Sequence, residues 1–499
     1  YPSARPHMGH AYSSIIADFF SRFKTIDGYK VFFLTGTDEH GLKIQRSAEK
    51  EGLDPLKFCD QISKTFKDLS KTLNLTNTDF IRTTEKRHKL SVQNLWKELE
   101  KNDDIYLSKY SGWYSVSDEA FYSEEEIETV DGVKQSKLSG SLVEWVEEES
   151  YFFKLSKWQK PLLKFYEENK NFILPISRKN EVISFVKSGL KDLSVSRKSF
   201  KWGIPVPSNQ DHVIYVWLDA LINYLSALNF TDKNNNLYQD FWPADLHIIG
   251  KDILRFHAVY WPAFLLAAGI SVPKRVYGHG WILSGDQKMS KSKGNILDPL
   301  EIINIYGLDP LRYYLIKEVS FGNDGNISKE KLESCINSDL ANNYGNLCQR
   351  VISFCEKNAQ LKIGKKIDLT KDDENELSKF TDNLDKIINY IDNQDINSYI
   401  NFVVDRLFAA NKYFNDQEPW NKKYDKLRVN TIIYTSFELI RKITIFLYPI
   451  IPETSLKVMK IFNYSKKDIT FDAVKRNDYI KNGMTLNKIG ILFKKIEKK

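Results

Sequence analysis

The stretch V-Y-G-H-G-W-I-L-S-G-D-Q-K-M-S-K-S-K-G-N, from Val276 to Asn295, decides how the rest of the chain is interpreted. Its first residues are apolar, as in a buried strand, and they end at a glycine-bearing turn. A polar turn then leads to Lys288 and Lys291, which are joined by serines and followed by a further lysine and a glycine. Such a cationic loop suits a polyphosphate whose charge moves during reaction. A K-x-x-K motif alone is common on solvated surfaces, so this interpretation needs support elsewhere in the chain.

That support lies near the start of the chain, at Pro6-His7-Met8-Gly9-His10. The next residues carry apolar side chains at three- and four-residue intervals, which predicts an amphipathic helix. The N–H groups at a helix N-terminus bind anions, Gly9 allows a ligand to approach closely, and imidazoles can donate to phosphate oxygens. A helix-capping histidine beside a structural one would give the same motif. Together, the two motifs favour a nucleotide site.

Composition limits the classes of protein to which the chain can belong. Its 499 residues, 42% hydrophobic and 27% charged, suffice for about two or three domains with their own cores. No apolar run is long enough to span a bilayer and no secretory signal opens the chain, so we predict a cytoplasmic protein without a membrane partner. The four cysteines lack a C-x-x-C spacing, which argues against disulfides and a thiolate zinc site. The net charge of +7 comes from residues 451–499, as expected of either a nucleic-acid partner or a solvated tail.

The first half of the chain changes character near residue 107. Residues 1–106 combine helical stripes with short apolar runs such as Lys30–Leu34, which end in polar, glycine-bearing loops. In open parallel sheets, ligands bind at that edge. Residues 107–210 are aromatic and acidic with the alternation of short strands, followed by a helical pattern from Trp158 to Glu168. We interpret this segment as an insertion between two halves of a parallel sheet.

The second half returns to the sheet and then becomes helical. Within residues 211–330, His212–Leu221 is predicted as a strand leading to a helix, and Asp245–Asp252 as a strand ending in a polar turn. Residues 331–499 carry stripes of period 3.6 typical of a helix bundle, with a charged linker from Lys365 to Glu376. The predicted fold class is therefore α/β, with a Rossmann-like parallel-sheet domain split by an inserted connective domain and followed by an α-helical bundle.

Taken together, His7–His10 and Lys288–Ser292 match the HIGH and KMSKS motifs of class I aminoacyl-tRNA synthetases, with Met8 in place of isoleucine. Over nearly its whole length the chain resembles the methionyl-tRNA synthetases. The matching pieces include F-L-T-G-T-D-E-H-G, Y-V-W-L-D-A-L, G-K-D-I-L-R-F-H-A-V-Y-W-P-A, G-H-G-W-I-L and E-P-W. The resemblance implies that ATP, bound as its Mg²⁺ complex, activates L-methionine to methionyl-adenylate. It further implies that the methionyl group is then transferred to the terminal adenosine of tRNA(Met), including the initiator tRNA. It also implies that the bundle binds the anticodon.

The resemblance assigns residues to the methionine site. Asp38 is expected to pair with the substrate ammonium, and Leu221 stands where some relatives have proline. A polarisable sulfur between aromatic rings gains contacts that a branched aliphatic group would not. His257 alone would read equally well as a core histidine, but in this context it is expected in the pocket wall. The expected methionine-binding residues are Tyr1, Asp38, Trp217, Ala220, Leu221, Tyr224, Ile253, His257 and Tyr260.

The resemblance likewise assigns the nucleotide and anticodon residues. Lys288 and Lys291, with His7 and His10, are the expected catalytic groups, because they would stabilise charge on the reacting phosphates. No general base stands out, so catalysis is expected to rest on positioning and electrostatics. The expected ATP-binding residues are His7, Gly9, His10, Gly250, Asp252, Trp281, Ile282, Lys288 and Lys291. The expected anticodon-binding residues are Asn346, Arg350 and Trp420, of which the tryptophan would stack on an unpaired base.

The chain departs from the family pattern in two places. Many methionyl enzymes carry cysteine zinc knuckles in the inserted domain, but Tyr110–Glu149 contains no cysteine, so no structural zinc or other metal site is expected. No appended tRNA-binding module follows the bundle, so we expect a monomer. Three alternatives stay open on the sequence: a small-molecule nucleotidyltransferase, a different class I synthetase, and a non-catalytic RNA-binding paralogue. The long bundle argues against the nucleotidyltransferase, and the absence of a large editing insertion argues against a different class I synthetase. The two intact ATP motifs argue against the non-catalytic paralogue.

Overall fold

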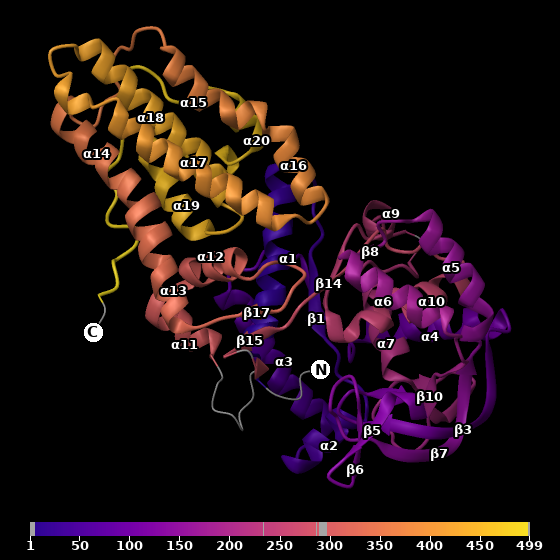
Figure 1. Ribbon diagram of the computed structural model, residues 1–499. Coiled ribbons are helices and arrows are strands. Elements are labelled where there is room, and N and C mark those ends of the chain that lie inside the picture. Colours follow the sequence, from indigo (N-terminus) through magenta and orange to yellow (C-terminus); the bar gives the residue numbers. More distant parts are fainter. Residues whose placement is uncertain (1–4, 233, 286, 289–296, 498–499) are drawn as a thin grey trace. The chain divides into compact units, whose positions relative to one another are not determined.

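The computed structural model describes residues 5–232, 234–285, 287–288 and 297–497. The chain divides into two compact units, which are described separately (Figure 1). The first unit is Phe32–Gly280 with the described residues before His7, and the second joins His7–Val31 to Trp281–Lys499. The helix that opens with His7 thus packs with the C-terminal half of the chain, although it precedes the first strand.

Parallel strands form the framework of the first unit, as the α/β prediction requires. Strand β1 (Leu34–Thr37) pairs in parallel with β2 (Asp79–Arg82), and helices α2 (Leu42–Lys50) and α3 (Pro55–Thr72) connect them. A second parallel group has the order β13-β14-β8. Its strands are β13 (His247–Gly250), β14 (Val276–His279) and β8 (Ile173–Leu174). The strand predicted at Val276 and the one predicted within Asp245–Asp252 are confirmed.

The strand predicted at Lys30–Leu34 is misplaced, because β1 begins only at Leu34. The amide of Phe33 donates to the hydroxyl of Thr78 at 3.0 Å, so a side chain takes the place of a ladder partner there. Within β1, Gly36 lies so close to β2 that an added Cβ would stand 2.0 Å from the carbonyl oxygen of Ile81. Only glycine fits where β1 and β2 approach each other so closely. This close approach positions the polar loop that follows β1.

The inserted segment contains the short strands that were predicted, and they pair in antiparallel. Its main sheet has the order β4-β3-β7-β9, built on the long pair β3 (Ile105–Ser115) and β7 (Glu144–Phe153). The helix predicted at Trp158–Glu168 is α5 (Gln159–Glu168). The remaining elements of the insertion are β4 (Ala120–Tyr122), β5 (Ile127–Val130), β6 (Val133–Ser136), α6 (Ile176–Lys187), β9 (Leu193–Ser194), β10 (Ser196–Arg197) and β11 (Pro205–Val206).

The strand predicted at His212–Leu221 is too long. Strand β12 (Asn209–Ile214) stops at Ile214, and helix α7 (Val216–Leu221) starts two residues later. The Tyr215 amide still donates to Val195, whereas the Tyr215 carbonyl already accepts the helical bond of Asp219. An apolar run that is buried on all sides does not distinguish strand from helix, which explains the error.

Buried residues from distant segments share one core in the first unit. This core runs from α4 (Lys86–Lys101) through the insertion to α7 and α10 (Trp261–Ala267). Between the strand β13 and α10 the chain turns through a short 3-10 helix, Lys251–Ile253, and a π-helix, Phe256–Tyr260. A π-helix turns its side chains away from regular α-helical positions, and such segments are frequent at functional sites.

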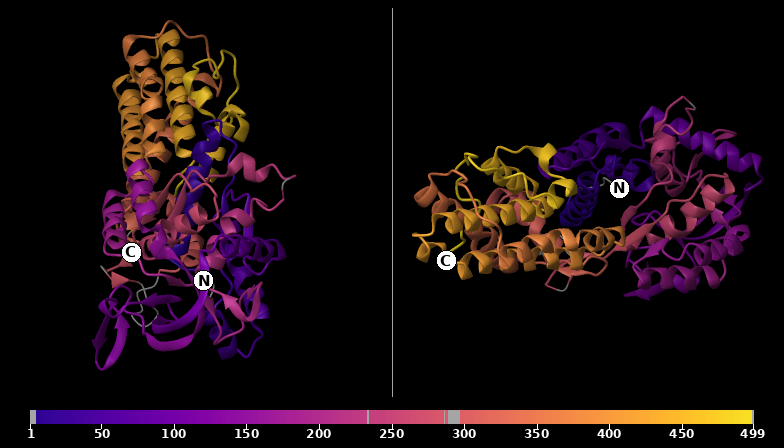
Figure 2. Two further views of the ribbon diagram at one scale, coloured as in Figure 1. Left: turned by 90° about the vertical axis from the view of Figure 1, so that its right-hand side faces the viewer. Right: turned by 90° about the horizontal axis from the view of Figure 1, so that it is seen from above.

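The second unit is mainly a helix bundle, as predicted for its C-terminal part (Figures 1 and 2). Helices α14 (Asn346–Ala359), α17 (Ile396–Asp416) and α18 (Lys426–Leu447) pack on one another. The linker predicted at Lys365–Glu376 is shorter than expected, because Thr370 caps α15 and the helix begins at Lys371. The other helices of the bundle are α13 (Lys329–Cys335), α15 (Lys371–Asp382), α16 (Leu384–Asp392), α19 (Pro452–Met459) and α20 (Phe471–Lys475).

A buried ionic cluster ties α1 (Met8–Ile26) to the base of the bundle. Asp18 accepts from Arg22 and from Arg312 of α12 (Leu308–Glu318), both at 2.7 Å. The Arg312 guanidinium also donates to the carbonyls of Pro449 and Ile450, just after α18. Three segments that are far apart in the sequence thus meet at one guanidinium.

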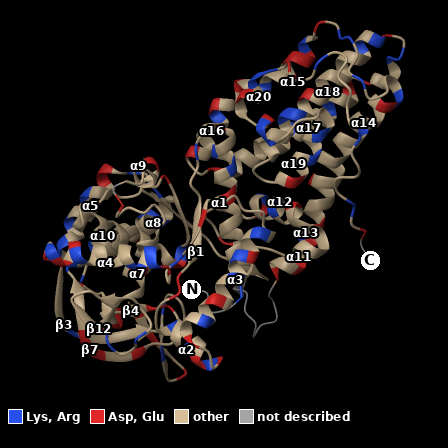
Figure 3. Cartoon of the chain, turned by 180° about the vertical axis from the view of Figure 1, so that it is seen from behind, with Lys and Arg blue, Asp and Glu red and all other residues tan. Residues whose placement is uncertain are grey.

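The surface of the bundle carries charges of both signs, which alternate along its helices (Figure 3). The C-terminal surplus of lysine noted above is therefore one part of a mixed surface. Among the described residues, no helix combines the length and the apolarity that a membrane crossing requires.

Candidate active site

Aromatic and imidazole rings gather around α7 in the first unit. Trp217, Ala220 and Leu221 of this helix are all buried. The Trp217 ring stacks on Phe256, with ring centroids 3.9 Å apart and planes 7° from parallel. Phe256 was not among the predicted residues, and only its place in the π-helix beside His257 identifies it. Stacked rings of this kind provide a flat, polarisable wall.

His257 joins this wall through two hydrogen bonds that define its tautomer. Its Nδ1 lies 3.0 Å from the carbonyl of Ile253, and its Nε2 lies 2.9 Å from the hydroxyl of Tyr224. A carbonyl can only accept, so Nδ1 carries the proton and Nε2 accepts from Tyr224. Burial lowers the pKa of His257 to about 4, so the imidazole is neutral at physiological pH. The predicted Ile253, Tyr224 and His257 are thus brought together.

A second buried imidazole extends the wall. His247 stacks against Tyr224, with ring centroids 4.0 Å apart, and burial lowers the pKa of His247 to about 3. Tyr260 packs edge-on against Phe256, at 5.6 Å between centroids. Sequence reasoning missed His247, because a lone histidine in a strand carries no distinguishing signal. The wall therefore presents several rings and no net charge, which suits a polarisable thioether.

Asp38 lies in the loop after β1, in the same unit. Burial raises the pKa of Asp38, and the nearby carboxylate of Asp219 raises it further. A partly buried carboxyl whose ionisation is opposed in this way gains most from a cationic ligand, because the ligand supplies the missing countercharge. The predicted ammonium partner therefore has suitable electrostatics. Tyr1 lies outside the described residues.

The histidine motif lies in the second unit and shapes the start of α1. His7 is the N-cap residue, and its Nδ1 accepts from the amide of Gly9 at 3.1 Å. The His10 Nδ1 accepts from the amide of His7 at 3.1 Å, and the two rings lie 3.9 Å apart. Burial lowers the pKa of His10, and His7 lowers it further. Each neutral ring accepts at Nδ1 and so carries its proton on Nε2, the atom that would donate to a phosphate oxygen.

The other predicted ATP-site residues divide between the units. In the first unit, Gly250 ends β13 and Asp252 lies in the following 3-10 helix. A Cβ at Gly250 would stand 2.6 Å from the Asp252 carboxylate, so the Asp252 side chain lies directly against this glycine.

In the second unit, Trp281 precedes β15 (Ile282–Ser284), which pairs in parallel with β17 (Gly325–Asn326). The Trp281 amide donates to the carboxylate of Asp324 at 2.8 Å, a partner that the sequence did not suggest. Of the lysine loop, the structure describes the backbone of Lys288. Lys288 belongs to β16 (Gln287–Lys288) and pairs with Leu283 of β15. Lys291 lies outside the described residues.

Two of the predicted anticodon residues, Arg350 and Trp420, contact one phenylalanine of the bundle. Asn346 is exposed and lies one turn before Arg350 on α14. The Arg350 guanidinium lies 5.4 Å from the centroid of the Phe414 ring, and Trp420 packs edge-on against the same ring at 6.1 Å. Trp420 is 37% exposed, so part of its ring is open to solvent. A half-covered indole beside a guanidinium is a stacking surface for an unpaired base.

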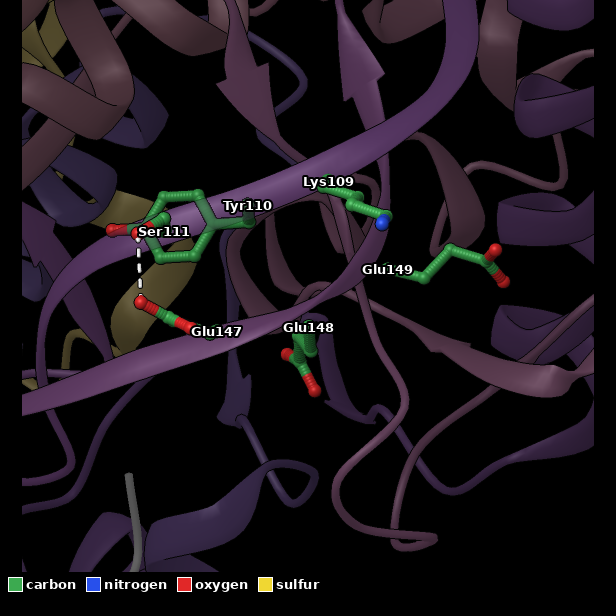
Figure 4. Close-up of a pocket in the computed structure, with 6 residues that line it drawn as sticks. All are labelled: Lys109, Tyr110, Ser111, Glu147, Glu148 and Glu149. Carbon is green, nitrogen blue, oxygen red and sulfur yellow. Dashed lines mark hydrogen bonds between the residues drawn. The ribbon is translucent and has the colours of Figure 1, made fainter.

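The inserted sheet carries a hollow of a different kind. It is lined by Lys109, Tyr110 and Ser111 of β3 and by Glu147–Glu149 of β7 (Figure 4). None of the predicted site residues lines it, and Ser111 already donates to Glu147 at 3.4 Å. Within the described ranges, no group of three or more histidine, cysteine, aspartate or glutamate side chains is arranged to hold a metal ion. In the insertion, Asp118 accepts from the hydroxyls of Tyr122, Ser139 and Ser141.

Comparisons with known proteins agree with this arrangement. The family model for class I tRNA synthetases (M) matches residues 1–132 and 133–352. The model for the anticodon binding domain of methionyl tRNA ligase matches residues 366–499. The methionine–tRNA ligase of Rickettsia conorii is 47% identical over 504 residues, covering 100% of this chain and 98% of the relative. That of Brucella suis is 47% identical over 463 residues, covering 92% of this chain and 90% of the relative.

Solved structures give the same result. The Mycobacterium tuberculosis methionyl-tRNA synthetase in complex with methionyl-adenylate superposes with a TM-score of 0.96 at 42% identity. The superposition covers 99% of this chain and 97% of that one. The free form of the same enzyme gives a TM-score of 0.90 at 39% identity, covering 100% of this chain and 97% of that one.

Proposed function

Because this chain belongs to the class I methionyl-tRNA synthetases, we propose roles for its residues in the two reactions of a methionine–tRNA ligase. The enzyme activates L-methionine with ATP to methionyl-adenylate and pyrophosphate, and then transfers the methionyl group to tRNA(Met). The observation that carries the assignment of residues is the uncharged wall of rings around Trp217 and His257, since it matches a thioether substrate.

The methionine side chain is proposed to lie against Trp217, Tyr224 and His257. Neutral His257 is held by Tyr224 and the Ile253 carbonyl, so it can line the pocket without attracting a charged side chain. Asp38 is proposed to bind the ammonium, because burial and the charge of Asp219 oppose its ionisation and a cationic ligand would favour it. The remaining members of the proposed pocket are Tyr1, Ala220, Leu221, Ile253 and Tyr260.

The nucleotide is proposed to enter with Mg²⁺ as its substrate complex. His7 and His10 would donate from Nε2 to its phosphate oxygens at the start of α1, where the helix dipole also favours negative charge. Lys288 and Lys291 would stabilise the α-phosphate during attack by the methionine carboxylate and the departing pyrophosphate. Gly250 and Asp252 are proposed at the ribose, and the backbone of Trp281 and Ile282 near the adenine.

In the bundle, Asn346, Arg350 and Trp420 are proposed to read the anticodon. Arg350 and Trp420 both pack against Phe414, so a base stacked on the indole would bind at the same part of the bundle as the guanidinium. The monomeric state, the cytoplasmic location and the use of the initiator tRNA stay predictions from the resemblance, and sedimentation and charging of purified tRNAs would test the first and the last.

Pyrophosphate exchange into ATP, with each amino acid supplied singly, tests the assigned roles. We expect exchange with methionine alone, and its loss in Lys291→Ala. Lys274→Ala is the matched control, because Lys274 is exposed and pairs only with Asp245 among the described contacts of its side chain. Exchange with another amino acid would overturn the pocket assignment. Full exchange in Lys291→Ala would overturn the role of the lysine loop.

A further inference from the structure

A buried carboxylate lies behind the methionine pocket and has no role in the assignment above. Asp219 of α7 is 1% exposed. Its Oδ2 lies 2.6 Å from Nδ1 of His40, and its Oδ1 lies 2.6 Å from Nε2 of His88. Both histidines are themselves buried, at 2% and 0% exposure. Buried ionisable groups are costly unless they are paired, so such a cluster needs an explanation.

His88 is held at both of its ring nitrogens. Its Nε2 donates to the carboxylate of Asp219. Its Nδ1 lies 2.9 Å from the hydroxyl of Ser226, which is itself 2.9 Å from the carbonyl of Ile222. These contacts fix the ring of His88 against Asp219.

The cluster connects the two segments that carry the proposed substrate contacts. His40 lies two residues after Asp38, in the loop that would bind the ammonium. Asp219 lies on α7 between Trp217 and Ala220, which would line the thioether pocket. His88 holds both from α4, and Ser226 belongs to α8 (Asn223–Ser226), which also carries Tyr224. A shift of Asp219 would therefore change the distance between the ammonium site and the pocket wall.

We propose that Asp219, held by His40 and His88, is a positioning residue that makes the site specific for the α-ammonium of the amino acid. It does so by fixing the Asp38 loop against α7 and by adding a second negative charge beside the ammonium. This proposal rests on the proposed role of Asp38. It concerns the recognition of the amino group, whereas the rings around Trp217 recognise the side chain.

The ionisation of the two carboxyls supports this division of roles. Burial opposes ionisation of Asp219, but His40 and His88 outweigh it and lower the pKa of Asp219. Asp38 has the opposite shift, because burial and then the Asp219 charge raise its pKa. Asp219 thus keeps its charge, and that charge opposes the ionisation of Asp38 until a cation binds. A substrate ammonium provides that charge, and a hydroxyl group does not.

Two methionine analogues separate this electrostatic role from a packing role. L-methioninol keeps the thioether and the ammonium, whereas the α-hydroxy analogue of methionine keeps the thioether and has no ammonium. Inhibition of methionine-dependent pyrophosphate exchange gives an inhibition constant for each. In Asp219→Asn we expect the constant for methioninol to rise about tenfold, the size typical of removing a group that orients a ligand from behind. The constant for the hydroxy analogue and the KM for ATP should stay within about twofold.

His40 provides a second test that does not depend on how well Asp219→Asn folds. In His40→Asn the amide nitrogen replaces Nδ1 and can still donate to Asp219, whereas His40→Leu removes the donor. We expect His40→Leu to weaken methioninol selectively and His40→Asn to restore binding to within about twofold of the unmodified enzyme. Equal weakening of both analogues, or equal effects of the two His40 variants, would overturn the proposal. Asp38→Asn is run in parallel: if it leaves methioninol inhibition unchanged, the assignment of Asp38 fails instead.

Discussion

Arg312→Met should destabilise the second unit strongly, because this side chain joins three distant segments through buried contacts. The guanidinium is fully buried and lies 2.7 Å from Asp18 of α1. It donates to the carbonyl of Ile450 at 2.9 Å and to that of Pro449 at 3.0 Å. Methionine has a similar length but offers none of these donors, so the substitution tests the polar contacts more than the packing.

The expected loss follows from these three contacts. Removing one partner of a buried ion pair costs about 3–5 kcal/mol, because the other charge stays buried. Here Arg22 still pairs with Asp18 at 2.7 Å, which limits that part of the loss. The carbonyls of Pro449 and Ile450 each lose a charged donor, at about 1–3 kcal/mol for a buried group left unsatisfied. We therefore expect a decrease of about 3–5 kcal/mol in the free energy of unfolding of this unit.

Urea unfolding followed by far-ultraviolet circular dichroism measures this change, since the helical signal reports the bundle. Arg476→Met is the matched control: its pair with Asp478, at 2.6 Å, is as short but exposed, and we expect no measurable change there. The double variant Asp18→Leu/Arg312→Met should lose less than the sum of the single variants, because each single variant already removes the Asp18–Arg312 contact and it can be lost only once. A loss below about 1 kcal/mol, or strict additivity in the double variant, would refute the reasoning.

Three further predictions concern the two sites and the sheet. Because burial raises the pKa of Asp38 and the ammonium needs its ionised form, the KM for methionine should rise as pH falls through that raised pKa. The folded state also binds this proton more tightly than the unfolded chain, so an ionised Asp38 destabilises the fold at neutral pH. Asp38→Asn should therefore raise the melting temperature at neutral pH while abolishing pyrophosphate exchange, and a lower melting temperature would contradict this. Trp420→Ala should lower kcat/KM for tRNA about 10- to 100-fold, whereas Trp420→Phe should stay close to the unmodified enzyme. Pyrophosphate exchange should be unchanged in both variants, and an equal loss of exchange would rule out a role confined to the anticodon. Gly36→Ala should leave little folded protein, because its Cβ would lie 2.0 Å from the Ile81 carbonyl oxygen, whereas Gly490→Ala, with nothing within 4 Å, should express normally.

Much of the site could be predicted because its signals are local. The H-x-G-H motif predicted a helix start, and His7 is indeed the N-cap of α1. The i and i+4 spacing of Asn346 and Arg350 placed both on one helix face, and both lie on α14. Strand limits were less accurate: the runs at Lys30–Leu34 and His212–Leu221 are apolar throughout, and such a run does not encode where pairing stops.

By itself, the sequence determined the class of fold and the family, because motifs, periodicity and composition are properties of short segments. Only the tertiary structure decided which residues support those motifs from behind. Phe256 against Trp217, His247 against Tyr224, and His40 and His88 around Asp219 come from segments up to 179 residues apart. A buried charge or ring is meaningful only through its partners, and partners brought together by folding leave no pattern in the order of the chain.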